Sequence, residues 1–262
     1  MSDLSGRVIV FTGGETGIGR ATVLDVAAEG AIVVIGGILE EEGAKTVQAV
    51  HDAGGKAEFH RVDVRHADQV DALIDGAVRD HGRIDGLVNS AAIFDGFASG
   101  IDTTDALWDQ IMNVNARGTF FACRAALRHM VLAGRGRIVN VASIGGLVGM
   151  ADGASYTASK HAVIGLTKHL GCYYAHAGIT VNAVCPGAIE TNVRGNSARI
   201  LGADAPPMGG VGASQDWVKT AIPMQRKGQA AEISGIIGFL LGDKASYVTA
   251  ACFTADGGWT AK

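Results

Sequence analysis

Short apolar runs rich in β-branched residues alternate along the chain with stretches whose apolar residues recur at helical spacing. Most of the runs are continuously apolar, as expected of parallel strands covered on both faces. The helical stretches 18–30 and 67–82 each end in glycine, a common helix stop. Alternation of this kind builds a parallel sheet through right-handed crossovers and predicts a doubly wound α/β fold. The expected strands, about seven, are 7–12, 31–36, 57–64, 86–91, 137–142, 179–185 and a short one within 252–258.

Residues 187–222 break the alternation, because they show no strand pattern and hold two of the four prolines. A loop of this length in a compact domain is usually a functional lid or disordered. At 262 residues the chain lies near the upper limit for one hydrophobic core. We therefore expect a single domain over residues 1–262, with 187–222 as a loop that covers the substrate.

Composition and charge exclude several classes of protein. With 48% apolar and 18% charged residues the chain is unlike a disordered one. A net charge of −4 without a Lys/Arg cluster argues against nucleic acid as a partner. The four cysteines are isolated and the eight histidines form no ligand set, so we expect a reduced, cytoplasmic setting and no metal. No signal-peptide pattern and no apolar stretch long enough for a membrane helix is present.

The turn "TGGETGIG", residues 12–19, follows the first expected strand directly. Its glycines permit a tight turn and let the backbone approach a pyrophosphate, whose charge is met by the amides of the next helix. An ordinary strand-to-helix connection is the other interpretation of a glycine-rich turn.

Tyr156 and Lys160 lie one helical turn apart in an expected helix over 153–176. They could be a surface pair, but a phenol with an ordinary pKa near 10 is a poor base at neutral pH. A cation roughly 5 Å away, in an effective dielectric near 20, favours the phenolate by about 3 kcal/mol, or about two pKa units. We therefore expect Lys160 to lower the pKa of Tyr156 and make it a proton-transfer group.

Several separately spaced motifs together resemble the short-chain dehydrogenase/reductase family, in its compact single-domain branch. They are the glycine turn at 12–19, "NSAA" at 89–92, Y-x-x-x-K at 156–160, "CPGAIET" at 185–191 and "DGG" at 256–258. The resemblance extends from Arg7 to Gly258. It implies a Rossmann-like dehydrogenase domain that moves a hydride between a nicotinamide cofactor and a secondary alcohol or ketone.

The resemblance also implies a catalytic set of Asn115, Ser143, Tyr156 and Lys160. Tyr156 would exchange the proton, and Ser143, 13 residues earlier at a strand end, would polarise the substrate oxygen. Lys160 would also hold the nicotinamide ribose, and Asn115 would hold a water that leads protons to it. Ser143 could otherwise be an ordinary loop-forming serine.

The same resemblance supplies the residues expected to bind the cofactor. Asp63 would reach the adenine, although it could instead cap the loop after its strand. Ser90 and Ala92 depart from the family's N-N-A-G, and the methyl of Ala92 puts a close backbone approach in doubt. The full set is Gly13, Thr16, Gly17, Ile18, Gly19, Asp63, Val64, Asn89, Ala91, Tyr156, Lys160, Pro186, Gly187, Ile189 and Thr191.

The choice between NAD and NADP rests on charge near the second strand. The residue that normally selects the cofactor aligns with Gly37, which is neither acid nor base. No Lys or Arg lies between Ala21 and Ala44, and Glu15 would oppose an extra phosphate. We expect NAD(H), with NADP left open.

Other functions stay open at this stage. A halohydrin dehalogenase-like enzyme uses the same fold, but with arginine in place of Lys160, and a catalytically silent nucleotide-binding protein is a further alternative. Met208, Val211 and Trp217 in the covering loop could line an apolar substrate pocket or pack on their own domain. Family likeness implies a homo-oligomer, a tetramer or dimer built on helices around 103–133 and 153–176. The expected partner is a small-molecule alcohol or ketone.

Overall fold

The computed structural model describes residues 4–261, and its centre is one parallel sheet of seven strands in the order β3-β2-β1-β4-β5-β6-β9. The doubly wound, Rossmann-like fold is therefore confirmed, and the seven expected strands are all present with small shifts at their ends. Their bounds are β1 Val8–Thr12, β2 Ile32–Gly37, β3 Lys56–Arg61, β4 Gly86–Asn89, β5 Gly136–Val141, β6 Ile179–Pro186 and β9 Cys252–Ala255.

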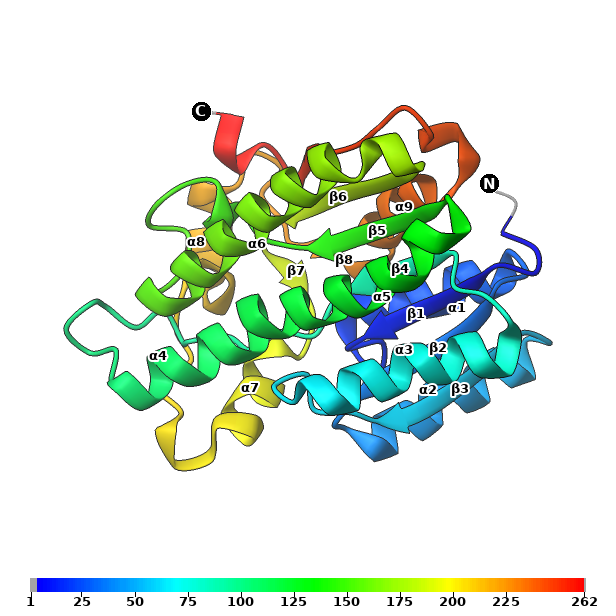
Figure 1. Cartoon of the computed structure of the whole chain (residues 1–262). Helices are drawn as coiled ribbons and strands as arrows, with labels where there is room; N and C mark the ends of the chain where they lie inside the picture. Colours follow the sequence, from blue (N-terminus) through cyan, green and yellow to red (C-terminus); the bar gives the residue numbers. More distant parts are fainter. Residues whose placement is uncertain (1–3, 262) are drawn as a thin grey trace.

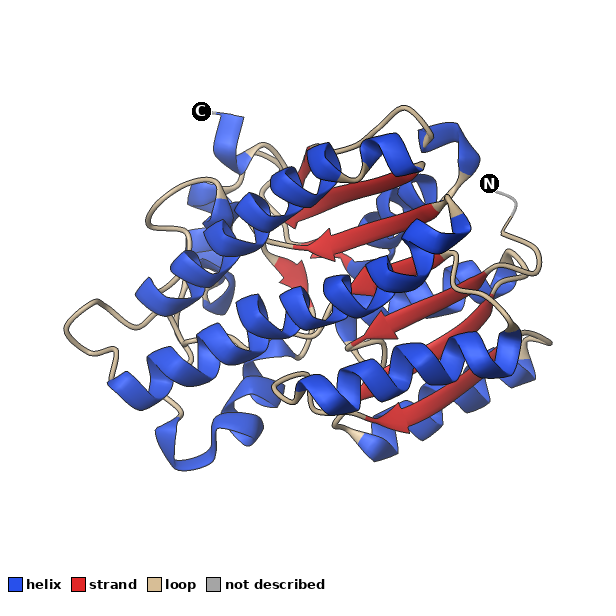
Figure 2. Cartoon of the chain, viewed as in Figure 1, coloured by secondary structure: helices blue, strands red, loops and turns tan. Residues whose placement is uncertain are grey.

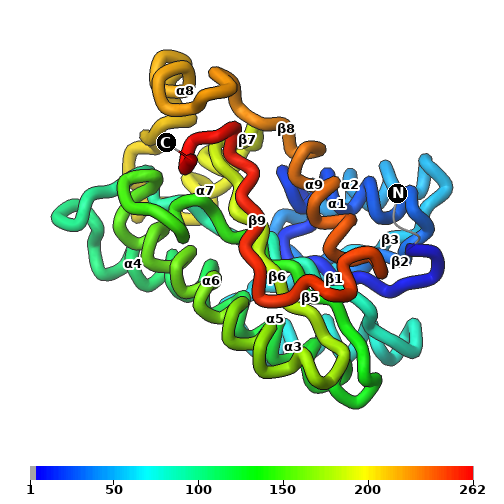
Figure 3. The backbone as a smooth tube through the Cα atoms, turned by 90° about the horizontal axis from the view of Figure 1, so that it is seen from above, coloured from blue at the N-terminus to red at the C-terminus, as the bar shows by residue number. Residues whose placement is uncertain are grey.

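Helices cover both faces of the sheet (Figures 1 and 2). Side chains alternate along β1: Val8 and Val10 pack into the core on the α3/α5/α6 face, and Ile9 and Phe11 into the core on the α1/α2/α9 face. Figure 3, seen from above, shows the two helical layers with the sheet between them. The helices are α1 Gly17–Ala28, α2 Glu40–Asp52, α3 Ala67–His81, α4 Asp105–Ile111, α5 Thr119–Ala133, α6 Ala154–Tyr173 and α9 Ala230–Leu241.

The strand order reverses at β1, which pairs with β2 on one side and with β4 on the other. In open α/β sheets a ligand crevice opens outside the carboxyl ends of the strands at such a point. The glycine turn follows β1 there. In Figure 1 the strand arrowheads point toward α7 and α8, which lie beyond that end of the sheet.

Residues 187–222, expected to form a covering loop without a strand pattern, contain short elements. These are β7 Ile189–Glu190, α7 Val193–Leu201 and α8 Gln215–Ala221, and β7 pairs with β8 Gly228–Gln229 in a second small sheet. The sequence did not indicate these elements because they are too short to give a periodic apolar pattern. Only Ser197 and Leu201 of α7 and Val218 of α8 are buried.

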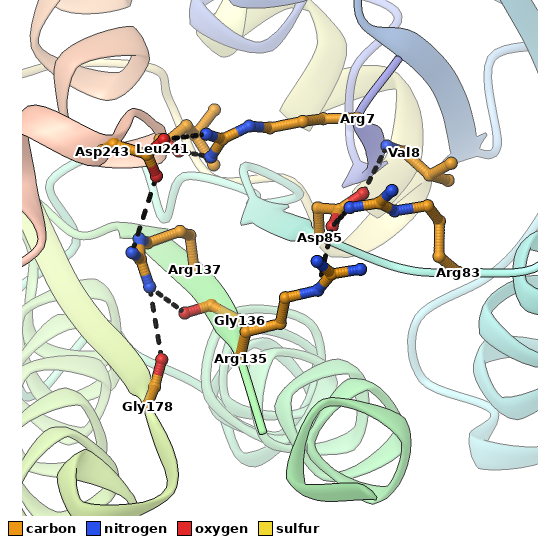
Figure 4. A network of polar contacts seen from close by, with 10 residues as sticks. All are labelled: Arg7, Val8, Arg83, Asp85, Arg135, Gly136, Arg137, Gly178, Leu241 and Asp243. Atoms are coloured by element: carbon orange, nitrogen blue, oxygen red, sulfur yellow. Dashed lines mark hydrogen bonds and ion pairs between the residues drawn. The ribbon is translucent and has the colours of Figure 1, made fainter. Parts of the chain in front are cut away.

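Polar contacts tie the elements together at the opposite, amino-terminal edge of the sheet (Figure 4). Asp85 lies between β4 and its neighbours: its carboxylate accepts a hydrogen bond from the Val8 amide at 3.0 Å and pairs with Arg83 at 2.6 Å. Arg7 pairs with Asp243 at 2.7 Å. This network lies at the end of the sheet away from the glycine turn, so it supports the fold and not the site.

Among residues 4–261, no helix is both long and apolar enough to cross a membrane. The same part of the chain contains no group of three or more His, Cys, Asp or Glu side chains arranged to hold a metal ion.

Candidate active site

A single cavity runs from the glycine turn to α6 along the carboxyl ends of the strands. It joins segments that lie far apart in the sequence, and most of the expected site residues line it. From the expected sets these are Gly13, Thr16, Gly17, Ile18, Asp63, Val64, Ala91, Ser143, Tyr156, Lys160, Pro186, Gly187, Ile189 and Thr191.

The glycine turn is shaped by close backbone approach. Gly13 has a φ of +72°, and a Cβ there would lie 2.5 Å from the backbone of Ala91. Gly17 has a φ of +55°, and a Cβ there would lie 3.3 Å from the Thr191 side chain. Both positions need the conformational freedom of glycine, and Gly13 also lets the turn approach the backbone of Ala91 closely.

Glu15 occupies the space that a side chain at residue 37 would need. A Cβ on Gly37 would collide with both the carboxylate carbon and the oxygens of Glu15. Glu15 is 5% exposed, its Oε2 is buried without a hydrogen-bond partner, and burial raises the pKa of its carboxyl. The backbone amides of Leu39 and Ile38 act against that rise. An acidic group therefore does stand at the end of β2, but it comes from the glycine turn.

Asp63 lies at the cavity edge and also shows the local contacts of a loop cap. Its Oδ1 accepts the Arg65 amide at 3.0 Å, and its Oδ2 pairs with the Arg65 guanidinium at 2.6 Å. Burial alone would raise the pKa of Asp63, but hydrogen bonds from Arg65 hold it below its usual range. Both interpretations of Asp63 are compatible with this geometry.

Two expected cofactor residues, Asn89 and Gly19, do not line the cavity. The Asn89 side chain joins neighbouring strands: its Oδ1 accepts a hydrogen bond from Thr12 Oγ1 at 3.2 Å and its Nδ2 donates to Asn140 Oδ1 at 2.8 Å. A Cβ on Gly19 would collide with the carbonyl oxygen of Gly13. Both residues therefore have a structural role: Asn89 ties β4 to β1 and β5, and Gly19 lets α1 pack closely against the glycine turn.

Lys160 is held between the sheet and the ring of Tyr156. Its Nζ donates to the Val141 carbonyl at 2.9 Å and lies 5.3 Å from the centroid of the Tyr156 ring. Burial lowers the pKa of Lys160 to about 8, although Asp152 opposes that shift.

The prediction that Lys160 lowers the pKa of Tyr156 was wrong. Burial raises this pKa above its ordinary value, and the negative charges of Asp152 and Asp95 add to the rise. The sequence argument counted the nearby cation, but it could not count desolvation or two carboxylates that come from distant segments.

Ser143 contacts Asp152, a carboxylate that lines the same cavity and that the sequence did not indicate. Its hydroxyl donates to Asp152 Oδ2 at 3.1 Å and accepts from the Gly145 amide at 3.0 Å. Burial raises the pKa of Asp152 to about 6. Nothing in "MADGASY" marks Asp152 as a site residue, because its contact with Ser143 depends on how the loop folds back.

Asn115 does not line the cavity but supports its wall from behind. It lies in a π-helical turn, Met112–Gly118, that is continuous with α4 and α5. Its side chain accepts from the Ile93 amide at 2.9 Å and donates to the Ile93 carbonyl at 3.0 Å and to Ser159 Oγ at 3.1 Å. Turns of this kind occur often at functional sites.

Asp95 fixes the start of α6 and was also missed. This residue is fully buried, and its Oδ2 accepts the Ser155 hydroxyl at 3.0 Å and the Tyr156 amide at 2.9 Å. The N-cap residue of α6, Gly153, offers no side-chain cap. Asp95 therefore caps the helix from another segment, at the amide of Tyr156 itself.

The covering segment, residues 187–222, places its three apolar candidates for a substrate pocket in different surroundings. Val211 lines the cavity, Met208 packs against the core, and Trp217 is half exposed with its ring 6.4 Å from that of Phe97. Arg194 of α7 also lines the cavity, with its guanidinium 5.4 Å from the centroid of Phe94, which packs edge-on against Tyr156. The segment therefore supplies both apolar and charged wall.

Comparison with known proteins decides the family. A family model described as "Enoyl-(Acyl carrier protein) reductase" matches residues 13–260. The chain belongs to the short-chain dehydrogenase/reductase family.

Relatives of this chain share its full length. It is 40% identical to cis-4-hydroxycyclohexanecarboxylate dehydrogenase of Sinomonas cyclohexanicum, with 97% of each chain covered. It is 35% identical to 3beta-hydroxysteroid dehydrogenase 2 of Eggerthella lenta, covering 98% of this chain and 96% of that one. The crystal structure of levodione reductase superposes with a TM-score of 0.89 at 34% identity, covering 98% of this chain and 99% of the other. The chain is thus an oxidoreductase that uses a nicotinamide cofactor, NAD or NADP, on alcohols and ketones.

Proposed function

We propose that this chain oxidises a secondary alcohol, or reduces the ketone, with Tyr156 as the residue that exchanges the proton. One observation carries the proposal: Ser143, Tyr156 and Lys160 line the same cavity as the glycine turn. The bound nicotinamide would accept or return the hydride. The protein's part is orientation and electrostatics.

The residues of the cavity fit a dinucleotide. Gly13, Thr16 and Gly17 line the cavity where α1 begins, so a pyrophosphate there would meet the free amides of the helix start, and the segment from Pro186 to Thr191 lines the same space. Lys160, held by Val141, would donate to ribose hydroxyls. Asn115 would act behind it, through water, as a route for protons to Lys160.

Tyr156 and Ser143 would share the substrate oxygen. Ser143, whose single hydroxyl proton lies on Asp152 in this structure, would turn that proton to the substrate oxygen, and Tyr156 would take the proton of the oxygen as the hydride leaves. Because burial raises the pKa of Tyr156 in this structure, the positive charges of Lys160 and of the oxidised nicotinamide must together offset the burial and the two carboxylates.

Replacing Tyr156 tests this assignment. We expect Tyr156→Phe to lower kcat at least a thousandfold, because the proton acceptor is lost, and to change the dissociation constant of NADH less than threefold. NADH fluorescence titration and steady-state rates measure the two effects. Tyr173→Phe, the same change on the exposed end of α6, is the control and should leave both unchanged. A Tyr156→Phe enzyme with the wild-type rate would rule out Tyr156 as the acid/base.

NAD(H) is the proposed cofactor, and Glu15 supports the choice. Its buried carboxylate stands where the side chain of residue 37 would be, with one oxygen unpaired and no cation among the groups that shift its pKa. A carboxylate at this place can accept hydrogen bonds from a ribose diol and repels a 2′-phosphate. Asp63 and Val64 would meet the adenine end.

Removing the charge of Glu15 tests cofactor choice. We expect Glu15→Gln to tighten NADPH binding at least tenfold relative to NADH, as measured by fluorescence titration without substrate. Glu41→Gln, an exposed acid on α2, is the control that should leave the ratio unchanged. If wild-type protein already binds NADPH as tightly as NADH, the choice of NAD(H) is wrong.

A ring-borne secondary alcohol is the proposed substrate class. The names of two relatives, a hydroxycyclohexanecarboxylate dehydrogenase and a hydroxysteroid dehydrogenase, denote ring alcohols, and apolar Ile144, Ile200 and Val211 line the cavity here. Lys160 and the open glycine turn argue against a dehalogenase. A catalytically silent nucleotide-binding protein would bind NADH but would form no NADH from NAD⁺ with any alcohol.

We propose a homo-oligomer in the cytoplasm. Phe120, Val131 and Leu132 of α5 are exposed, and together with Leu170 and Tyr174 they line a shallow groove beside α6. A second copy covering this groove would bury that apolar surface. Light scattering gives the mass of the assembly, and a monomer would contradict the proposal.

The four cysteines support a location in the cytoplasm, because all of them are free and disulfides are rare there.

A further inference from the structure

Asp152 places a carboxylate next to the position where the substrate oxygen would lie. Its Oδ2 accepts the Ser143 hydroxyl at 3.1 Å, and a Cβ on Gly145 would collide with that oxygen. Within residues 4–261, Oδ1 has no hydrogen-bond partner, and the side chain lines the cavity. Asp152 therefore has acceptor capacity left over at the wall of the cavity.

Keeping this carboxylate costs free energy that an apolar substrate would not repay. Burial raises its pKa, and the charge of Asp95 adds to the rise. The wall also includes apolar Ile144, Ala151 and Val211, so an apolar substrate packed there would leave the free oxygen of Asp152 without a partner. Buried, costly charges that line a cleft are candidates for binding or catalysis.

A hydroxyl group suits Asp152 better than a cation does. Lys160 and Arg194 already act on it as positive charges, and both line the same cavity. An ammonium group beside Asp152 would meet their repulsion, whereas a neutral hydroxyl donates a hydrogen bond without it. The reacting oxygen is taken by Ser143 and Tyr156, so this hydroxyl must be a second one.

We propose that Asp152 binds a second hydroxyl group, on the carbon next to the carbinol, and that the substrate is a vicinal diol or the matching hydroxyketone. The inference rests on the proposed function and narrows its substrate. The diol loses the hydride from one carbon to the oxidised cofactor and the proton from that carbon's oxygen to Tyr156, and the second hydroxyl stays intact.

Matched pairs of alcohols test the inference. With NAD⁺, we expect kcat/KM to be at least tenfold higher for cis-1,2-cyclohexanediol than for cyclohexanol, or for 2,3-butanediol than for 2-butanol. In Asp152→Ala the diol and the mono-alcohol should differ less than twofold. Asp216→Asn, which removes an acid of α8 that does not line the cavity, should keep the wild-type ratio.

Each outcome separates the inference from the proposed function. Equal kcat/KM for diol and mono-alcohol in both pairs, or a diol preference that persists in Asp152→Ala, would overturn the role of Asp152 while the dehydrogenase stands. A preference for trans-2-aminocyclohexanol over the diol would show that the bound group is an ammonium. If no alcohol is oxidised, the proposed function fails. The role of Asp152 can then still be tested by thermal shift in the presence of NAD⁺. The inference requires that the diol raises the Tm of the wild-type protein more than cyclohexanol does.

Discussion

Three carboxylates line the cavity, and each has different neighbours, from which we infer what it would bind. Glu15 is buried with an unpaired oxygen, Asp63 is held ionised by Arg65, and Asp152 has one oxygen on Ser143. Glu15 and Asp63 flank the part of the cavity beside β2 and β3, whereas Asp152 lies beside α6. The first two can therefore act on a nucleotide and the third on the substrate.

The pKa of Asp152 predicts a pH dependence for its proposed contact. Because burial raises this pKa to about 6, the group is neutral below that pH and ionised above it. A hydrogen bond to the ionised form is stronger, so the ratio of kcat/KM for diol and mono-alcohol should rise as pH increases through about 6. Taking the ratio removes titrations of Tyr156 and Lys160 that both alcohols share.

Groups facing Asp152 set where this transition lies. Asp95 moves its pKa up, whereas Ser143, Lys160 and Arg194 move it down. The ratio should be measured from pH 5 to pH 8 in wild type and in Asp152→Asn, whose ratio should not change with pH. A transition that survives in Asp152→Asn would assign it to another group.

Among single residues, the family's motifs could predict which side chains meet at the end of the sheet, although their roles stay predictions. Ser143, Tyr156 and Lys160 reach one cavity as the sequence predicted. Asp95 and Asp152 could not be found, because each acts through a contact with a segment that the sequence does not place. Gly37 was seen as a missing signal, and only the structure shows that Glu15 fills its place.

At the scale of elements, α6 depends on a cap that comes from outside it. Asp95 accepts the Tyr156 amide at 2.9 Å, which satisfies one of the free N–H groups at the helix start. Asp95→Ala should lower the free energy of unfolding by about 2 kcal/mol, because the Ser155 hydroxyl and the amides of Tyr156 and Phe97 lose their acceptor. Urea denaturation measures the loss.

An exposed acid at another helix start provides the control for Asp95. Asp68 is exposed in the first turn of α3, where a negative charge interacts favourably with the helix dipole. Asp68→Ala should cost only about 0.3–1 kcal/mol. Equal losses in the two variants would mean that Asp95 does not cap α6.

Elements were predictable where an apolar pattern repeats. The seven strands and the glycine stop at Gly82, with a φ of +75°, follow from period and turn chemistry. The helices α7 and α8 do not, because each buries one or two side chains and is positioned by the rest of the fold. Tertiary contacts decide such short elements.

At the scale of the whole molecule, the sheet separates chemistry at one edge from stabilising contacts at the other. The cavity lies beyond the carboxyl ends of the strands, and the network of Asp85, Arg7 and Asp243 joins β1, β4 and the end of α9 at the amino ends (Figure 4). A change in the network should therefore alter stability and leave the reaction unchanged.

Asp85 gives the test of this separation. Its carboxylate is buried and accepts the Val8 amide at 3.0 Å, so Asp85→Ala leaves a buried N–H without its partner and removes the pair with Arg83. We expect the free energy of unfolding to fall by about 2–3 kcal/mol, with kcat/KM unchanged at 25 °C. Asp243→Ala is the matched control: its side chain is 77% exposed, so losing its ion pairs with Arg7 and Arg137 should cost under about 1 kcal/mol. A fall in kcat/KM for Asp85→Ala, in protein shown by circular dichroism to be folded, would mean that the two edges of the sheet are coupled.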